Sequence, residues 1–329
     1  GGGGIGQGLL AGETINLTWY QQMPDNFEGD FYLLIEIINQ DASEIFSMDS
    51  SPLITLSSNN LGTTTLMDTT VINGTFAERP SVNKSGRYVV YEKSVESNGQ
   101  IRQQIYLMDM LIPEAQPRLI SKAFSHNGGG NANSFRPKIS LDGNTIVFHS
   151  SATDLVPGDT NNKEDVFLYR VSTGTILRAT NAENEQLNGR SLYPDVNGDG
   201  SVVVFESDAT NADPSFSSGG QQIYLWNINE SAGSSLTAIT QGNQPSYGPS
   251  IDDVGNRIVF DSLADDLITS DNNGLQDVFL YERKKNNSGT ISLVSRTFQQ
   301  TQTIGGASFD AKISGNGEKI VFVSKARNL

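Results

Sequence analysis

Apolar residues occur along this chain in short runs separated by polar turns, and residues 136–180 show the pattern most clearly. Residues 145–149 (TIVFH) and 165–169 (DVFLY) are rich in β-branched and aromatic side chains, which is typical of strands. Shorter extended runs occupy residues 136–140 and 175–179. The pattern therefore predicts one small sheet of four antiparallel strands joined by turns.

The same four-run unit recurs, with anchor positions 80, 137, 194, 249 and 311 and spacings of 57, 57, 55 and 62 residues. A glycine such as Gly143 follows each first run, where a tight turn needs positive φ. The fifth copy reaches Leu329 before its third run. One such sheet cannot bury both faces alone, so the copies are expected to stack. The repeat predicts an all-β fold, a β-propeller of four-stranded blades.

Aromatic side chains recur at matching positions of the second and third strands, and we expect them to fill the core between blades. They are Tyr88, Tyr91, Phe148, Phe205, Phe260 and Phe322, followed by Tyr106, Phe167, Tyr224 and Phe279. Trp226 departs from the repeat, and an outward, adhesive position is one hypothesis for it.

Residues 5–60 do not follow the repeat. Residues 13–20 (ETINLTWY) alternate in polarity, and residues 30–39 (DFYLLIEIIN) form an apolar run of strand length. These runs resemble the C-terminal half of bacterial cell-adhesion-related Ig-like domains, which implies a partial Ig-like β-sandwich at the N-terminus. Residues 1–4 (GGGG) are interpreted as a linker or a processing scar.

Propeller repeats are predicted over residues 61–329. Residues 63–67 (TTTLM) precede Arg79 as residues 118–121 precede Arg136, so they are interpreted as a fourth strand without three strands of its own. The fifth copy, in contrast, has its first two strands but reaches Leu329 before its third. We therefore expect an N-terminal strand to complete the last blade, in a ring of six blades that belongs to a longer protein.

The motif RPKISLDGNTIVFHS, followed by DVFLYRVSTGTILRAT, carries a family resemblance. It is similar to the repeats of TolB-type propellers, and the similarity extends over residues 79–329. The resemblance implies the fold. It leaves several roles open, because propellers of this kind serve as scaffolds, docking platforms and peptidase gates.

Composition narrows these roles. The net charge of −15 and the pI near 4.5 disfavour nucleic acid as a partner, because nucleic-acid binding needs basic patches. An acidic chain is compatible with divalent cations. There is no cysteine, which excludes disulfides and thiolate sites. No apolar run approaches the length of about 18 residues that a membrane span needs, so no membrane-spanning segment is expected.

Two loops that precede third strands share the spacing D-x-N-x-x-x-D. Their candidate ligands are Asp159, Asn161 and Asp165 in the second copy and Asp271, Asn273 and Asp277 in the fourth. Ca²⁺ takes six to eight oxygen ligands, and the spacing is similar to that of integrin-type calcium loops. It lacks the full acidic set, and Lys163 stands where another oxygen would help. The hypothesis is Ca²⁺ in at least one loop; the alternative is that these residues only cap turns.

Second strands end on recurring polar residues, which are Glu92, His149, Glu206 and Asp261. A ring of carboxylates raises the question of a glycosidase, which needs two carboxylates at a set separation in different environments. We favour a polar position that the repeat imposes. The chain has no G-x-S-x-G motif, and we expect it not to be an enzyme.

The sequence favours a secreted or cell-surface structural or adhesion module with loops stiffened by calcium, and a large multi-domain protein or extracellular assembly is one setting for it. Its expected partners are proteins or further copies of itself, with a surface glycan as another candidate. The first alternative is a TolB-like docking propeller in the periplasm or secreted. The second is the non-catalytic propeller half of a hydrolase whose active domain lies outside this segment.

Overall fold

The computed structural model describes residues 77–97, 99–112, 116–180, 184–213, 220–228, 235–269, 271, 273–284, 288–296 and 306–327. The chain divides into two compact units, Gly1–Thr69 and Thr70–Leu329, and all described residues belong to the second. The linker predicted at residues 1–4, the Ig-like strands within residues 5–60 and the strand at residues 63–67 lie outside the described residues.

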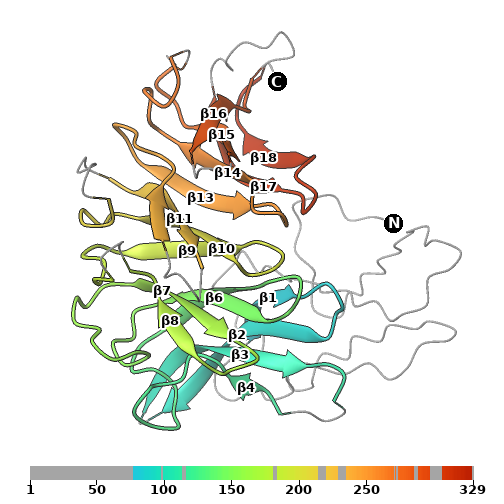
Figure 1. Cartoon of the computed structure of the whole chain (residues 1–329), viewed down its shortest axis with the longest axis vertical. Helices are drawn as coiled ribbons and strands as arrows, with labels where there is room; N and C mark the ends of the chain where they lie inside the picture. Colours follow the sequence, from blue (N-terminus) through green and yellow to red (C-terminus); the bar gives the residue numbers. More distant parts are fainter. Residues whose placement is uncertain are drawn as a thin grey trace, which may run out of the picture. The chain divides into compact units, whose positions relative to one another are not determined.

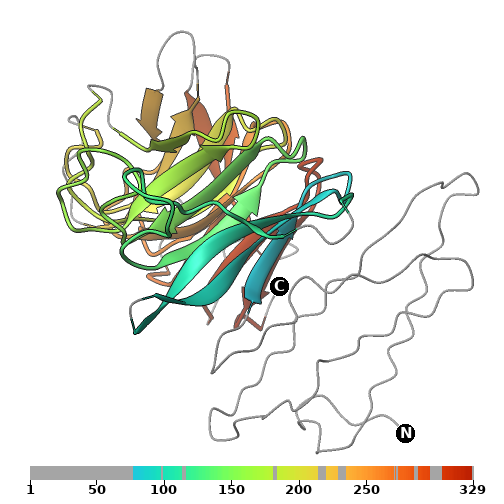
Figure 2. The same cartoon turned by 90° about the horizontal axis from the view of Figure 1, so that it is seen from below.

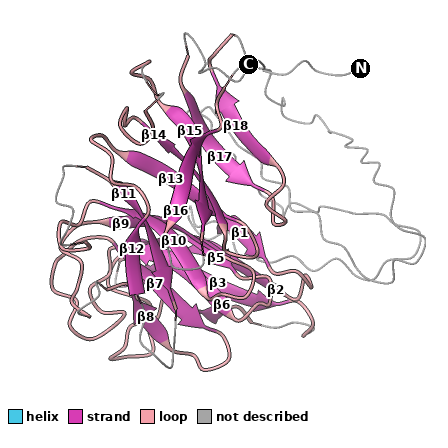
Figure 3. Cartoon of the chain, turned by 45° about the horizontal axis from the view of Figure 1, so that its top comes forward, coloured by secondary structure: helices cyan, strands magenta, loops and turns pink. Residues whose placement is uncertain are grey.

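The described residues form four four-stranded antiparallel sheets and one two-stranded sheet, each with its strands in sequence order (Figures 1 and 3). Blade A holds β1 (Ala77–Val82), β2 (Tyr88–Ser97), β3 (Gln100–Asp109) and β4 (Arg118–Leu119). Blade B holds β5 (Ser134–Ile139), β6 (Thr145–Ser150), β7 (Asp165–Arg170) and β8 (Ile176–Arg178). Blade C holds β9 (Ser191–Val196), β10 (Val202–Ser207), β11 (Gln222–Asn227) and β12 (Ser235–Ala238). Blade D holds β13 (Ser246–Ile251), β14 (Arg257–Ser262), β15 (Asp277–Arg283) and β16 (Gly289–Leu293), and the two-stranded sheet holds β17 (Ser308–Ile313) and β18 (Ile320–Ser324). In this part of the chain no helix is long and apolar enough to cross a membrane.

The strands predicted in residues 136–180 are confirmed. Residues 145–149 lie in β6, residues 165–169 lie in β7, and the fourth run forms the short strand β8. All six residues of β6 are buried, so this central strand has both faces covered. That burial explains its continuous apolar sequence, since a strand with one solvated face would alternate in polarity.

Neighbouring blades pack face to face, and alternate residues of a strand serve opposite neighbours. Phe148 and Phe167 of blade B pack with Ile105 of blade A, whereas Val147 and Leu168 of blade B belong to the cluster shared with blade C. The predicted core aromatics Tyr91, Phe148, Phe167, Phe205, Tyr224, Phe260 and Phe279 are buried. The outward hypothesis for Trp226 is wrong: its side chain is 2% exposed, because it fills the space between blades B and C.

First strands of successive blades lie next to one another, which Figures 1 and 2 show from two directions. We call this side of the stack, made by β1, β5, β9, β13 and β17, the first-strand edge. The turns after the first strands also touch in succession. The N–H of Asp142 donates to Gly198 O (3.1 Å), and the N–H of Gly198 donates to Asp253 O (2.9 Å). Gly143 has φ of 77°, as its predicted turn requires.

Candidate functional site

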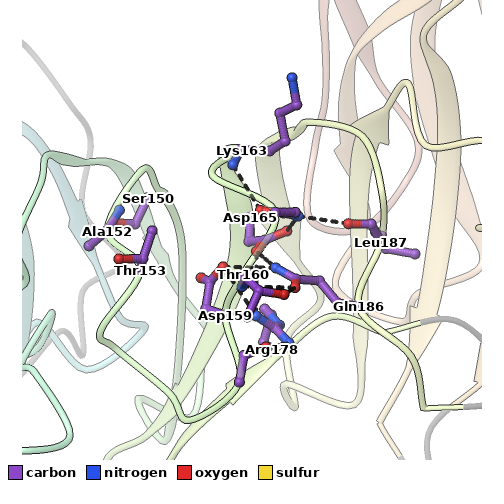
Figure 4. A network of polar contacts seen from close by, with 12 residues as sticks. Ser150, Ala152, Thr153, Asp159, Thr160, Lys163, Asp165, Arg178, Gln186 and Leu187 are labelled. Atoms are coloured by element: carbon purple, nitrogen blue, oxygen red, sulfur yellow. Dashed lines mark hydrogen bonds and ion pairs between the residues drawn. The ribbon is translucent and has the colours of Figure 1, made fainter.

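The loop before β7 brings Asp159 and Asp165 together, and both side chains are 1% exposed (Figure 4). Asn161 lies beside them. Its oxygen accepts the N–H of Lys163 (2.8 Å), while its nitrogen donates to Leu187 O (2.7 Å) and lies 3.4 Å from Asp165 Oδ1. The asparagine therefore directs its amide nitrogen, and not its oxygen, toward the carboxylate.

Arg178 at the end of β8 supplies a cation to this loop, which the sequence analysis did not anticipate. Its Nη1 lies 3.4 Å from Asp159 Oδ1 and 3.7 Å from Asp165 Oδ2. Gln186 bridges the same two carboxylates, donating to Asp159 Oδ1 (2.8 Å) and Asp165 Oδ2 (3.1 Å). Burial, with the charge of Asp159, raises the pKa of Asp165 to about 7, and the opposing effects of Gln186, Arg178 and Asn161 are smaller. Asp159 Oδ2 is buried without a hydrogen-bond partner.

The loop before β15 repeats the local turn. Asn273 Nδ2 donates to Asp277 Oδ2 (2.8 Å), and Asn273 Oδ1 accepts the N–H of Leu275 (2.7 Å). Asp271 and Asp277 are 6% and 0% exposed. The loops differ at the position of Arg178. Arg178 is opposite Phe167 across β7 and β8, whereas Leu293 is opposite the equivalent Phe279 across β15 and β16.

The other two blades have glutamine in their third strands at the position of Asp165 and Asp277. Gln104 Nε2 donates to Gly130 O (3.1 Å) and Ala132 O (3.0 Å), and Gln222 Nε2 donates to Gly242 O (3.2 Å). A glutamine at this position binds the loop that leads to the next blade through an uncharged amide. Aspartate is too short to make this contact, and in blade B Asn161 donates to Leu187 O instead. Part of the D-x-N-x-x-x-D pattern therefore has a structural explanation.

Within the residues that the structure describes, no three acidic or histidine side chains gather as a metal site. A calcium ion in either loop would therefore need amide or backbone oxygens in addition to its two carboxylates. The buried Oδ2 of Asp159 is suited to a cation, but the guanidinium of Arg178 already balances part of the negative charge of that loop.

Polar residues at equivalent positions of the second strands reach the next blade, and each accepts a backbone N–H from its first strand. We call Glu92, His149, Glu206 and Asp261 the inter-blade acceptors. Glu92 Oε1 accepts from Arg136 (2.6 Å), and Glu206 Oε2 accepts from Gly248 (2.8 Å). Asp261 Oδ1 accepts from Asp310 (3.1 Å), and the contact from Tyr193 to His149 Nδ1 is longer, at 3.4 Å.

The donors of these contacts share an unusual backbone conformation. Arg136, Tyr193, Gly248 and Asp310 all have φ between 51° and 61°. Each lies where the pairing of the first and second strands shifts register, which marks a β-bulge. The bulge leaves the N–H without a ladder partner, and the neighbouring blade supplies the acceptor. Proline follows the bulge residue in four of the five copies, and this is the signal from which sequence reasoning could have found the bulge.

The inter-blade acceptors differ in their ionisation. Glu92 receives a second hydrogen bond from Arg79 Nη1 (2.8 Å). Burial raises the pKa of Glu206 to about 7, with a further contribution from Asp261, and burial also raises the pKa of Asp261. Burial lowers the pKa of His149 to about 3, and the charges of Arg136 and Arg79 add to that effect. His149 is therefore neutral at physiological pH and can accept a hydrogen bond at Nδ1.

These partners identify the recurring acids as parts of the scaffold. The second oxygen of Glu206 accepts from Gln221 Nε2 (2.8 Å), and the second oxygen of Asp261 accepts from Gln276. Both oxygens of each carboxylate are thus engaged by the protein itself. The geometry is that of blade-to-blade attachment, as expected for a polar position imposed by the repeat.

No protein-family model and no curated protein matches the chain. Similar solved structures include a TolB protein from Agrobacterium tumefaciens, 21% identical, with a TM-score of 0.43 over 66% of this chain and 64% of that one. A puromycin-hydrolyzing peptidase from Mycobacterium tuberculosis is 14% identical, with a TM-score of 0.47 over 75% of this chain and 35% of that one. An oligogalacturonate lyase from Vibrio parahaemolyticus is 12% identical, with a TM-score of 0.45 over 77% of this chain and 64% of that one.

The chain spans between about a third and just under two thirds of the length of these structures. At such identities and TM-scores, their activities carry no argument about this chain. The propeller-type architecture rests on the chain's own features: four-stranded blades in sequence order, packed face to face, with adjacent first strands.

Proposed function

We propose that this chain is a non-catalytic module of the cell surface or the extracellular space, with a structural or adhesive role. One observation supports the proposal above others: the same attachment recurs from blade to blade. An inter-blade acceptor holds the bulge of the next first strand, as Glu206 holds Gly248. Repeated buried attachments make a rigid support for exposed loops, which suits binding to a large partner.

In this proposal the propeller has six blades, and an Ig-like domain precedes it in the chain. The partners are proteins or further copies of the chain, and a surface glycan is another candidate. A docking propeller of the TolB kind is the second candidate function, since a rigid stack of blades would serve it equally well. The two functions differ in their partners: an adhesive module joins two surfaces, whereas a docking propeller binds one protein in solution.

Calcium stiffens the loops in this proposal, and the loop before β15 is the better candidate. Asp271 and Asp277 are both buried, and Leu293 stands where the other loop has Arg178. Two buried carboxylates favour a divalent cation, and the position that Arg178 occupies in the other loop is apolar here. In the loop before β7, a cation would have to displace Arg178.

Thermal unfolding in EDTA and in about 1–5 mM Ca²⁺ tests the calcium part, since a ligand of the native state raises the midpoint. We expect a rise that is lost when Asp271→Asn and Asp277→Asn are combined and kept when Asp159→Asn and Asp165→Asn are combined. The second pair is the matched control. No rise in the unaltered chain would overturn the calcium sites.

Bead aggregation tests the adhesive role. Beads coated with the chain are expected to aggregate with each other or attach to a surface that bears the partner, and more strongly with Ca²⁺ than with EDTA. A module that docks one protein in solution would leave coated beads dispersed under both conditions. That result would overturn adhesion in favour of the docking function.

A further inference from the structure

Arg136 and Tyr193 meet at the first-strand edge. The guanidinium carbon of Arg136 lies 4.4 Å from the centre of the Tyr193 ring. Both residues occupy the bulge position of their strands, with φ of 52° and 51°. Both are exposed, Tyr193 at 39%. The stack therefore fixes an arginine side chain on the surface, where it would otherwise be free to move.

The guanidinium is near enough to Glu206 for its charge to lower the pKa of that carboxyl, but it forms no ion pair with a carboxylate among the described residues. Glu92 accepts the backbone N–H of Arg136 and pairs through its other oxygen with Arg79. Among the described residues, no oxygen accepts a hydrogen bond from the Arg136 side chain. A guanidinium presents its donors as a planar fork that matches a carboxylate in a bidentate geometry. Stacking on Tyr193 covers one face and leaves the donor edge available.

A second arginine lies next to the site, and its charge is balanced by Glu92. Arg79 occupies the equivalent bulge position in β1, next to Arg136 through their shared partner Glu92. His149 lies beneath Tyr193, with ring centres 5.7 Å apart, and is 6% exposed. The net charge of −15 acts weakly at this place, because physiological salt screens charges beyond about 8 Å.

We propose that Arg136, ordered by Tyr193, binds the carboxylate group of an acidic small molecule at the first-strand edge. The carboxylate lies in the plane of the guanidinium and accepts two hydrogen bonds from it. The shared chemistry is the carboxylate, whether an acidic amino acid or an acidic sugar carries it. This site is separate from both calcium loops and from the role of the inter-blade acceptors.

The two histidines of the chain provide the measurement. His149 lies under the proposed site, and His126 lies exposed in the loop between blades A and B. The NMR signal of His149 therefore reports on the site, and that of His126 serves as the reference. N-acetylglutamate and glucuronate are titrated as probes, with N-acetylglutamine and glucose as their uncharged controls. We expect one or both acids to shift the His149 signal in a saturable manner and to leave the His126 signal unchanged. The shift of the His149 signal should be larger than with the uncharged controls.

Variants assign the effect to Arg136. Arg136→Gln is expected to weaken binding by about tenfold or more, as the loss of a charged hydrogen-bond pair implies. Arg136→Lys keeps the charge without the fork and is expected to be intermediate. Arg118→Gln is the matched control, because Arg118 also stacks on a tyrosine, Tyr169, but on an outer strand. Absence of a saturable His149 shift with either acid, or an equal shift in Arg136→Gln, would overturn the proposal.

Discussion

Glu92 in blade A and Glu206 in blade C occupy the same position of the repeat and perform the same task in different electrostatic settings. Each accepts a backbone N–H from the bulge of the next blade. Glu92 also pairs with the guanidinium of Arg79, whereas the second partner of Glu206 is the uncharged amide of Gln221, with Asp261 nearby. The repeat determines that an acceptor is present, and the neighbouring side chains determine whether that acceptor is charged.

Blade B extends the comparison. It solves the same problem with His149, whose pKa of about 3 makes it a neutral acceptor at physiological pH. A carboxyl with a raised pKa, an ion-paired carboxylate and a neutral imidazole therefore serve equivalent contacts in one molecule. The common requirement is a hydrogen-bond acceptor for a part-buried N–H, and a fully buried group left unsatisfied would cost about 1–3 kcal/mol.

The largest effect is expected from Glu92→Ala. This change removes the acceptor of the Arg136 N–H and the partner of Arg79, so the free energy of unfolding should fall by about 2–3 kcal/mol. Chemical denaturation measures it. Glu96→Ala is the control, because Glu96 lies exposed on the same strand. Equal losses in the two variants would show that the contact between blades A and B contributes little.

The next effect is a pH dependence of opposite sign at two positions. The folded pKa of Glu206 is raised from 4.5 to about 7, so its stabilising contribution is complete below pH 4.5 and is lost as the pH rises to about 7. The folded pKa of His149 is lowered from 6.5 to about 3, so its contribution is complete above pH 6.5 and is lost as the pH falls toward 3.

Single variants separate these two contributions. Unfolding midpoints are measured between pH 4.5 and 7, and the slope of the midpoint against pH is compared with that of the unaltered chain. The slope should be more positive in Glu206→Gln and more negative in His149→Gln. His126→Gln is the control, since His126 is exposed. Slopes unchanged in both variants would contradict the different ionisation of the two acceptors.

The smallest effect is expected from Gly248→Ala at the bulge that Glu206 holds. Its φ of 58° costs an L-residue about 1 kcal/mol, and the new methyl group would meet only Asp261 Oδ1 at 3.5 Å. Denaturation midpoints measure the change. Gly158→Ala is the matched control, with φ of 74° and no neighbour within 4 Å. A much larger loss at Gly248 would mean that the bulge contact tolerates no side chain.

Local pattern determined the blades of this protein. Apolar runs with β-branched and aromatic residues predicted strands such as β6 and β7, and glycine predicted the tight turn at Gly143. Repetition of the unit predicted the stacking, because one sheet cannot bury both of its faces. These features depend on neighbours within a few residues or on a period, and both can be read along one chain.

Tertiary structure alone decided which polar groups meet. The inter-blade acceptors lie 42–49 residues from their donors, and Arg178 follows the first aspartate of its loop by 19 positions. No local pattern connects such residues. Trp226 likewise looked irregular in the sequence and lies buried between two blades. The sequence determined the strands and their repetition, whereas contacts between blades determined the charge state and partner of each polar side chain, because burial and neighbouring charges exist only once the blades have packed.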